Sequence, residues 1–168
     1  MEIKYKKGPV SALLTVYNNV MSEFISFLRP ITVDQYLTIV DDKTLDNDCR
    51  SIQTIVSHII NSGYGYAFYI GNSINVETAR PAYKLMNKDE IEVSLLDVIK
   101  FTKNVFADKE ISYEEIDAKI VKTPWNDDLY SIESILEHAI VHILRHKIQI
   151  ERFFKSIDKK QESYFGNK

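Results

Sequence analysis

Apolar residues recur at every third or fourth position in four long stretches of this chain, and this period is its strongest constraint on the fold. A spacing of about 3.6 residues places such side chains on one face of an α-helix. The stretches cover about residues 9–28, 51–70, 94–107 and 131–157. A helix with one apolar face buries it against another element, and we find no convincing strand pattern. The sequence therefore predicts an all-α fold, a four-helix bundle that forms a single domain over residues 1–168.

Residues that end helices are scarce. The chain has 5 glycines and 4 prolines, which favours long elements with few turns. Pro9 fits the first turn of the first helix. Ser94, with Asp97 three residues later, resembles the capping pair of the third helix. A further short helix is expected over residues 33–40, with Thr32 as its cap.

Two connections between the expected helices are long, at about residues 71–93 and 108–130. Connections of this length allow a crossover topology, and in compact domains they are often functional. Within the second, a short helix or a hairpin is expected around residues 111–121. Gly63 and Gly65 lie inside the second helix. They indicate either close approach by another backbone or a ligand, or simply a weaker helix.

The composition limits the class of protein. Hydrophobic residues make up 45% and charged residues 27%, as in ordinary globular chains. The formal net charge is -3, so there is no sign of the basic face that nucleic acid requires. Cys49 is the single cysteine, which excludes an intrachain disulfide and a cysteine-based zinc site. No apolar run reaches membrane length and no signal-peptide core follows the charged N-terminus, so we expect a cytoplasmic protein.

Three of the four histidines fall within nine residues of the last helix. His138, His142 and His146 follow one another at four-residue steps, so neighbouring pairs share one helix face. Residues eight apart are about 12 Å apart along the axis, too far to share one ion easily. At roughly 100° per residue, His146 lies about 40° from the centre of the apolar face, His142 about 80° and His138 about 120°. The pair His142 and His146 therefore faces the interior best.

The fourth histidine, His58, lies at the edge of the apolar stripe on the second helix. Ser62, Gly65 and Tyr69 stand on the same side, and the two small residues among them indicate a cavity. Three neutral imidazoles with an open fourth position are typical of sites that also bind water or substrate. Imidazole suits Zn, Ni, Fe or Cu. The alternative for His58 alone is a partly buried, hydrogen-bonded residue.

Other residues are candidates for a supporting role. Gln149 is the nearest neighbour of the inward pair, and it is a candidate for orienting His146 or a bound molecule. Tyr66, Tyr69 and Trp125 are candidates for shaping the pocket, although buried aromatic residues are more often part of a core. His138 is assigned an ordinary or supporting role rather than that of a ligand.

Two segments resemble the DinB-like superfamily, the damage-inducible family of bacterial metal-binding four-helix bundles. Residues 51–61, with His58, are similar to the family's second helix. Residues 130–150 match its last helix, in which two histidines four apart precede Arg-Gly-Gln-Ile or a similar run. The Thr-Pro-Trp125 stretch also resembles the segment that precedes the last helix in this family. The chain departs from the family pattern at Lys147 and Ile148, which leaves open how the turn after His146 is packed.

The resemblance implies a particular fold and chemistry. It implies an up-down-down-up bundle whose ligands His58, His142 and His146 bind a divalent metal, commonly nickel or zinc, with Fe, Cu or Mn as alternatives. It also implies frequent homodimers. Characterised relatives include thiol-dependent enzymes, among them transferases that use bacillithiol or mycothiol.

Three classes of function stay open at this point. The first is a metal-dependent enzyme, either a transferase of a low-molecular-weight thiol to an electrophile or a hydrolase. The second is a non-catalytic metal-binding or sensor protein, favoured because Glu137 falls on the outer face and Cys49 has no recognisable partner. The third is an interaction module, because Val141, Leu144 and Ile148 form an outer apolar stripe typical of a homodimer interface or a loop contact. A di-iron carboxylate centre is disfavoured, because the required Glu-x-x-His pairs are absent.

Overall fold

Four long helices dominate the computed structural model, which describes residues 8–125 and 129–165. The elements, in chain order, are α1 (Pro9–Leu28), α2 (Val33–Leu37), the 3-10 helix η1 (Asn47–Cys49), α3 (Ile52–Ser73), α4 (Ile91–Val105), α5 (Tyr113–Ala118), β1 (Ile120–Val121), β2 (Tyr130–Ser131) and α6 (Ile132–Phe165). The prediction of a helical protein is confirmed. None of the helices in these ranges combines the length and the apolar composition needed to cross a bilayer.

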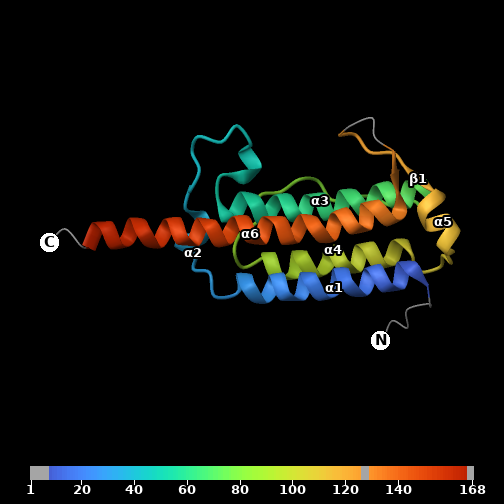
Figure 1. The fold of residues 1–168 in the computed structure, drawn as a ribbon, viewed down its shortest axis with the longest axis horizontal. Helices are drawn as coiled ribbons and strands as arrows, with labels where there is room; N and C mark the ends of the chain where they lie inside the picture. The colour runs from blue at the N-terminus through green and yellow to red at the C-terminus, as the bar shows by residue number, and fades with distance from the viewer. Residues whose placement is uncertain (1–7, 126–128, 166–168) are drawn as a thin grey trace.

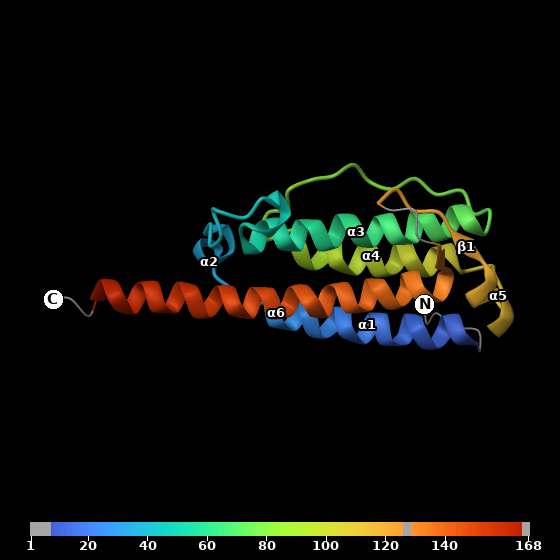
Figure 2. The ribbon, with the colours of Figure 1, turned by 45° about the horizontal axis from the view of Figure 1, so that its top comes forward.

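The long helices α1, α3, α4 and α6 lie side by side along one axis (Figures 1 and 2). Helices α3 and α4 run in one direction, and α1 and α6 run in the opposite direction (Figure 1). Because α3 and α4 are parallel, the chain between them has to return along the length of α3, as the green segment in Figure 2 does. The C-terminal part of α6 extends beyond the ends of the other three helices.

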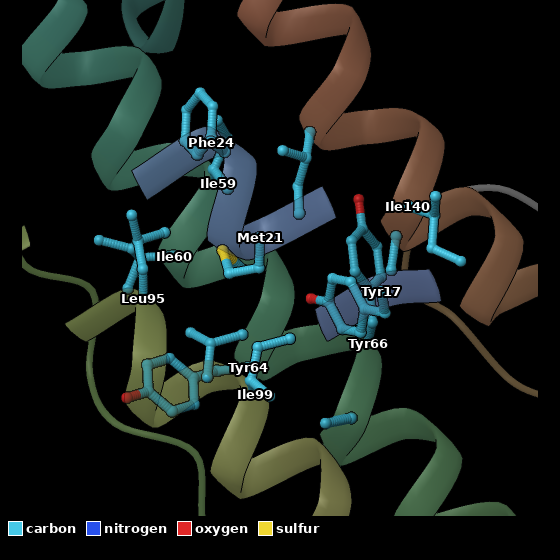
Figure 3. Close-up of a cluster of buried hydrophobic side chains, with 14 of the residues drawn as sticks. Tyr17, Met21, Phe24, Ile59, Ile60, Tyr64, Tyr66, Leu95, Ile99 and Ile140 are labelled. Atoms are coloured by element: carbon cyan, nitrogen blue, oxygen red, sulfur yellow. The ribbon is translucent and has the colours of Figure 1, made fainter. Parts of the chain in front are cut away.

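The core lies between these helices, and the predicted apolar stripes fill it. Figure 3 shows side chains from all four long helices pointing toward one another. Phe24 of α1, Ile60 of α3, Leu95 of α4 and Ile135 of α6 are each at most 1% exposed. Burying a side chain of this size stabilises the fold by about 1.5–3 kcal/mol, so the stripes account for most of the driving force.

Helix α3 carries part of the candidate site, and its position is set by local sequence. Ser51 and Thr54 form a capping box at its start. A Cβ atom at Gly63 would lie 2.5 Å from Cγ1 of Val98, so α4 approaches α3 closely only because this residue is glycine. The sequence left open a close approach by a backbone or a ligand and a merely weaker helix; the structure shows a close approach, but by a side chain of α4.

Several predicted helix ends were wrong. Helix α4 begins at Ile91 rather than at residue 94, and Ser94 does not cap it. Ser94 lies inside the helix, and Asp97 instead accepts a hydrogen bond from Tyr64 at 2.6 Å. Helix α6 continues eight residues beyond the predicted Ile157, to Phe165. Helix α2 does start after the Thr32 cap but ends at Leu37, because Thr38 is extended.

Of the two alternatives expected around residues 111–121, the second long connection contains the short helix. Residues Tyr113–Ala118 form α5, and Ile120 pairs with Ser131 in a short antiparallel ladder. This ladder was not predicted, because two-residue strands carry too little alternation to detect. It joins the residues that follow α5 to the start of α6.

The first long connection, residues 74–90, crosses α3 as an extended segment (Figure 2). It is tied down near its end, where the backbone oxygen of Met86 accepts hydrogen bonds from Tyr36 and Gln53, both at 3.0 Å. The Met86 amide donates to Ser57 Oγ at 2.9 Å. The end of the segment is therefore fixed to the first two turns of α3.

Candidate metal centre

Three histidine side chains from two helices converge on one point. Nε2 of His58 on α3 lies 3.0 Å from Nε2 of His142 on α6, and Nε2 of His146 lies 3.1 Å from the same atom. One ligand nitrogen from each of the three residues lies within 4.8 Å of the others. The sequence prediction that these three histidines are neighbours is confirmed, and they are close enough to hold a metal ion.

The order of burial along α6 also agrees with the helical-wheel prediction. His146 is 5% exposed, His142 is half-buried and His138 is exposed. His138 lies outside the convergent group, although its ring stacks on His142 with centroids 5.9 Å apart. Its position fits the supporting role that the sequence indicated.

The outer nitrogens of two of the rings have hydrogen-bond partners. Nδ1 of His58 lies 3.1 Å from Oδ2 of Asp48, and Nδ1 of His146 lies 2.9 Å from Oε1 of Gln149. Acceptors at this position fix the ring orientation and the tautomer of a metal-binding histidine. The predicted contact between Gln149 and His146 is therefore present, and Asp48 is a partner that the sequence did not reveal.

The proton count at the centre favours a cation. A carboxylate at Asp48 accepts from Nδ1 of His58, so a His58 ring with a single proton carries it on Nδ1 and presents a lone pair at Nε2. Oε1 of Gln149 imposes the same tautomer on His146. His142 can donate one proton to only one of these two nitrogens, so the other close pair has facing lone pairs. A tetrahedral ion at about 2.0–2.1 Å from each nitrogen would separate them by roughly 3.3 Å, close to the observed spacing.

The environment keeps two of these imidazoles neutral. Burial, followed by the neighbouring His146 and His58, lowers the pKa of His142 to about 3. Burial also lowers the pKa of His146, partly offset by its hydrogen bond to Gln149. A metal ion needs the neutral form, so at pH 7 it has no proton to displace from these two residues.

The loop before α3 completes the surroundings of the triad. Asp46 caps η1 by accepting from the Asp48 amide at 2.9 Å, and this turn directs Asp48 toward His58. The Cys49 thiol donates to Oε1 of Gln149 at 3.8 Å, a contact that the sequence did not reveal. Burial raises the pKa of the Cys49 thiol. An acidic residue shortly before a ligand-bearing helix was the only sequence sign of Asp48, and its spacing follows no fixed rule.

A pocket of about 390 Å³ opens beside the triad, against His58 and His142. Its other lining residues are Asn61, Ser62, Gly65, Tyr66, Tyr69, Arg80, Trp125, Tyr130, His138 and Arg145. The cavity expected from the small residues on α3 is present. The three aromatic candidates Tyr66, Tyr69 and Trp125 all line it, and the Trp125 ring lies edge-on to both tyrosines, with centroids 5.8 and 5.4 Å away.

Carboxylates are absent from the lining of this pocket within the described residues. Glu137 is exposed, as predicted, and does not line it.

Just after the triad, Lys147 places its Nζ 5.5 Å from the centroid of the Phe27 ring, and Ile148 is exposed. Where the chain departs from the DinB-like pattern, the turn after His146 is therefore packed against α1 through Lys147.

Comparison with known proteins adds no relative. No family model matches the chain, and no curated protein matches it. The resemblance to DinB-like proteins therefore rests on the residues of the two histidine-bearing segments alone.

Proposed function

We propose that this chain is a DinB-like protein that binds one divalent metal ion through His58, His142 and His146. The observation that carries the proposal is the convergence of three imidazole rings, in which Nε2 of His142 lies 3.0 Å from Nε2 of His58 and 3.1 Å from Nε2 of His146. Asp48 and Gln149 support it by holding two of the rings from behind. Nickel or zinc is the proposed ion, in line with the family resemblance.

The arrangement of the helices supports the proposed DinB-like topology. Helices α3 and α4 run parallel to each other and antiparallel to both α1 and α6, which fits the up-down-down-up order with residues 74–90 as the long crossover (Figure 1). In this order α3 and α6 are neighbours, and each contributes to the triad. We include this topology in the proposal.

The proposed activity is transfer of a low-molecular-weight thiol to an electrophile. A bound divalent ion lowers the pKa of a thiol or a water molecule that coordinates it. Hydrolysis also needs a group that moves protons to and from water; for this role the described lining of the pocket offers His138 but no carboxylate. A thiol is a strong nucleophile once its proton has left, so thiol transfer makes the smaller demand on this site.

The residues of the chain have separate roles in this proposal. The pocket wall formed by Tyr66, Tyr69 and Trp125 excludes water and positions the electrophile. His58 and His142 border the pocket, so a thiol inside it lies beside the metal centre. The sulfur forms a bond to the electrophilic carbon, the leaving group departs with its electron pair, and the thiol proton passes to solvent.

The test uses metal-loaded protein with monobromobimane, from which bromide leaves as the sulfur bond forms and fluorescence rises. We expect turnover with one or more small thiols, and its loss in His146→Ala. Glu137→Ala is the matched control on the same helix, because Glu137 is exposed and does not line the pocket, and it should keep both the metal and turnover. Turnover that is equal in His146→Ala and in the unaltered protein would contradict the proposal.

A non-catalytic metal-binding or sensor protein is the second candidate. It is favoured by the lack of a carboxylate in the described lining of the pocket. Tight metal binding without turnover for any thiol and electrophile pair would support this candidate over the first.

We also propose a homodimer through the outer face of α6. Val141, Leu144 and Ile148 are 59%, 39% and 50% exposed in the single chain. Sedimentation velocity at micromolar concentration should show a dimer that Leu144→Glu dissociates. A monomeric unaltered protein would contradict this proposal.

A further inference from the structure

The pocket beside the triad is strongly cationic, and this has a consequence for what it binds. Arg80 and Arg145 both line it, and no Asp or Glu of the described chain does. The protein as a whole carries a formal net charge of -3, so this positive region stands against the overall balance. A divalent ion held by the neighbouring histidines would add two further positive charges.

The side chain of Arg80 is exposed and contacts the wall of the pocket. It belongs to the segment 74–90 that crosses α3, and its Nη1 donates to the Tyr69 hydroxyl at 3.3 Å. A Cβ atom at Gly65 would lie 3.2 Å from the same Nη1, so the missing side chain of this glycine leaves room for the guanidinium. Gly65 therefore makes space for the charged group of Arg80. The sequence had suggested close approach by a backbone or a ligand, or a weaker helix.

Arg145 reaches the same pocket from α6, one turn after Val141 and three residues after His142. The positions three and four residues away on this helix are occupied by His142, Val141, Ile148 and Gln149, and none of these is acidic. The helix therefore offers no intrahelical ion pair to neutralise Arg145. Its guanidinium is free to act on a molecule in the pocket.

The remaining walls indicate the shape of the ligand. Tyr66, Tyr69 and Trp125 present aromatic rings, and Asn61 and Ser62 present uncharged polar groups. The volume of about 390 Å³ is that of a small-molecule site rather than of a macromolecular interface. Planar guanidinium groups bind carboxylates and phosphates through paired hydrogen bonds.

We propose that the pocket binds a small organic anion, a molecule with a carboxylate or phosphate group that pairs with Arg80 and Arg145 while its apolar part contacts the aromatic wall. This inference rests on the proposed function in one respect: the same molecule is the thiol that reaches the metal centre. The anionic group is the new element, because it selects charged thiols over neutral ones.

The experiment compares two thiols that differ by one charge, mercaptopropionate and its methyl ester, on metal-loaded protein. Trp125 is the only tryptophan of the chain and lines the pocket, so its fluorescence reports binding directly. Hydrogen bonds to charged groups contribute about 1.5–3 kcal/mol, so each arginine should change the dissociation constant by about tenfold or more. The acid should bind at least about tenfold more tightly than the ester.

The variants locate the effect. Arg80→Gln and Arg145→Gln should each weaken binding of mercaptopropionate and leave binding of its methyl ester unchanged. Arg152→Gln is the matched control, because Arg152 is exposed on α6 and does not line the pocket. Mercaptoethyl phosphate, measured in parallel, distinguishes a phosphate ligand from a carboxylate.

The outcomes separate this inference from the proposed function. Equal binding of acid and ester would overturn the anion site even if the metal and the thiol activity are present. If the protein binds no metal, benzoate on the metal-free protein gives the readout instead. Arginine-dependent binding of benzoate would then support the anion site, and binding unchanged in both arginine variants would overturn it.

Discussion

Asp48 gives the most specific prediction about the metal centre, because it touches the site without being a ligand. Its carboxylate lies 3.1 Å from Nδ1 of His58 and its side chain is 40% exposed. Losing such a partner typically lowers metal affinity by about 10- to 100-fold, and the exposure places Asp48→Ala near the lower end, at about tenfold or 1.4 kcal/mol. Asp48→Asn keeps an acceptor for Nδ1 of His58 and loses only the charge, so it should lower the metal affinity by roughly threefold.

The assay is competition for zinc or nickel with a chromophoric chelator at pH 7, with helicity checked by circular dichroism. Asp42→Ala is the control, because Asp42 is an exposed acid of the same loop and changes the charge equally. If Asp48→Ala and Asp42→Ala bind metal with the same affinity, the idea that Asp48 orients His58 fails.

Three further predictions concern the fold around the site. The folded-state pKa of His142 lies at about 3, below its unfolded value near 6.5, so only the unfolded chain takes up this proton as the pH falls between these values. Metal-free protein should therefore lose up to about 4 kcal/mol of stability from pH 6.5 toward pH 3, and denaturation of His142→Asn should show a shallower dependence. Gly63→Ala should lower the free energy of unfolding by about 1–2 kcal/mol, because crowding against Val98 exceeds the gain in helix propensity; urea denaturation with no loss of stability would contradict the close approach of α4. Tyr64→Phe removes the hydrogen bond to Asp97, so it should lower the free energy of unfolding by about 1 kcal/mol. An unchanged midpoint of urea denaturation would show that this bond contributes nothing.

The helices and the triad were predictable because both follow from one helical period. The apolar stripes placed the long helices to within a few residues, apart from the extra turns at the end of α6. The same wheel gave the observed order of burial of His138, His142 and His146. The choice of His58 needed less reasoning, because it is the only histidine outside α6.

The rest of the site depends on loops, whose paths leave no periodic pattern in the sequence. Asp48 and Cys49 reach the triad through η1, and Arg80 reaches the pocket through the segment that crosses α3. These contacts join residues far apart in the chain, so they follow from tertiary packing rather than from local propensity. The start of α4 was missed for a related reason, since Ser94 looks like a cap but lies inside the helix.

The most direct test of the central claim is the metal content of protein purified without a polyhistidine tag, measured by elemental analysis. The account predicts about one divalent ion per chain, lost in His58→Ala and in His142→Ala while helicity is retained. His138→Ala should keep the ion. No bound metal after reconstitution with nickel and zinc, or undiminished binding in the His58 and His142 variants, would contradict the claim that this triad is a metal centre.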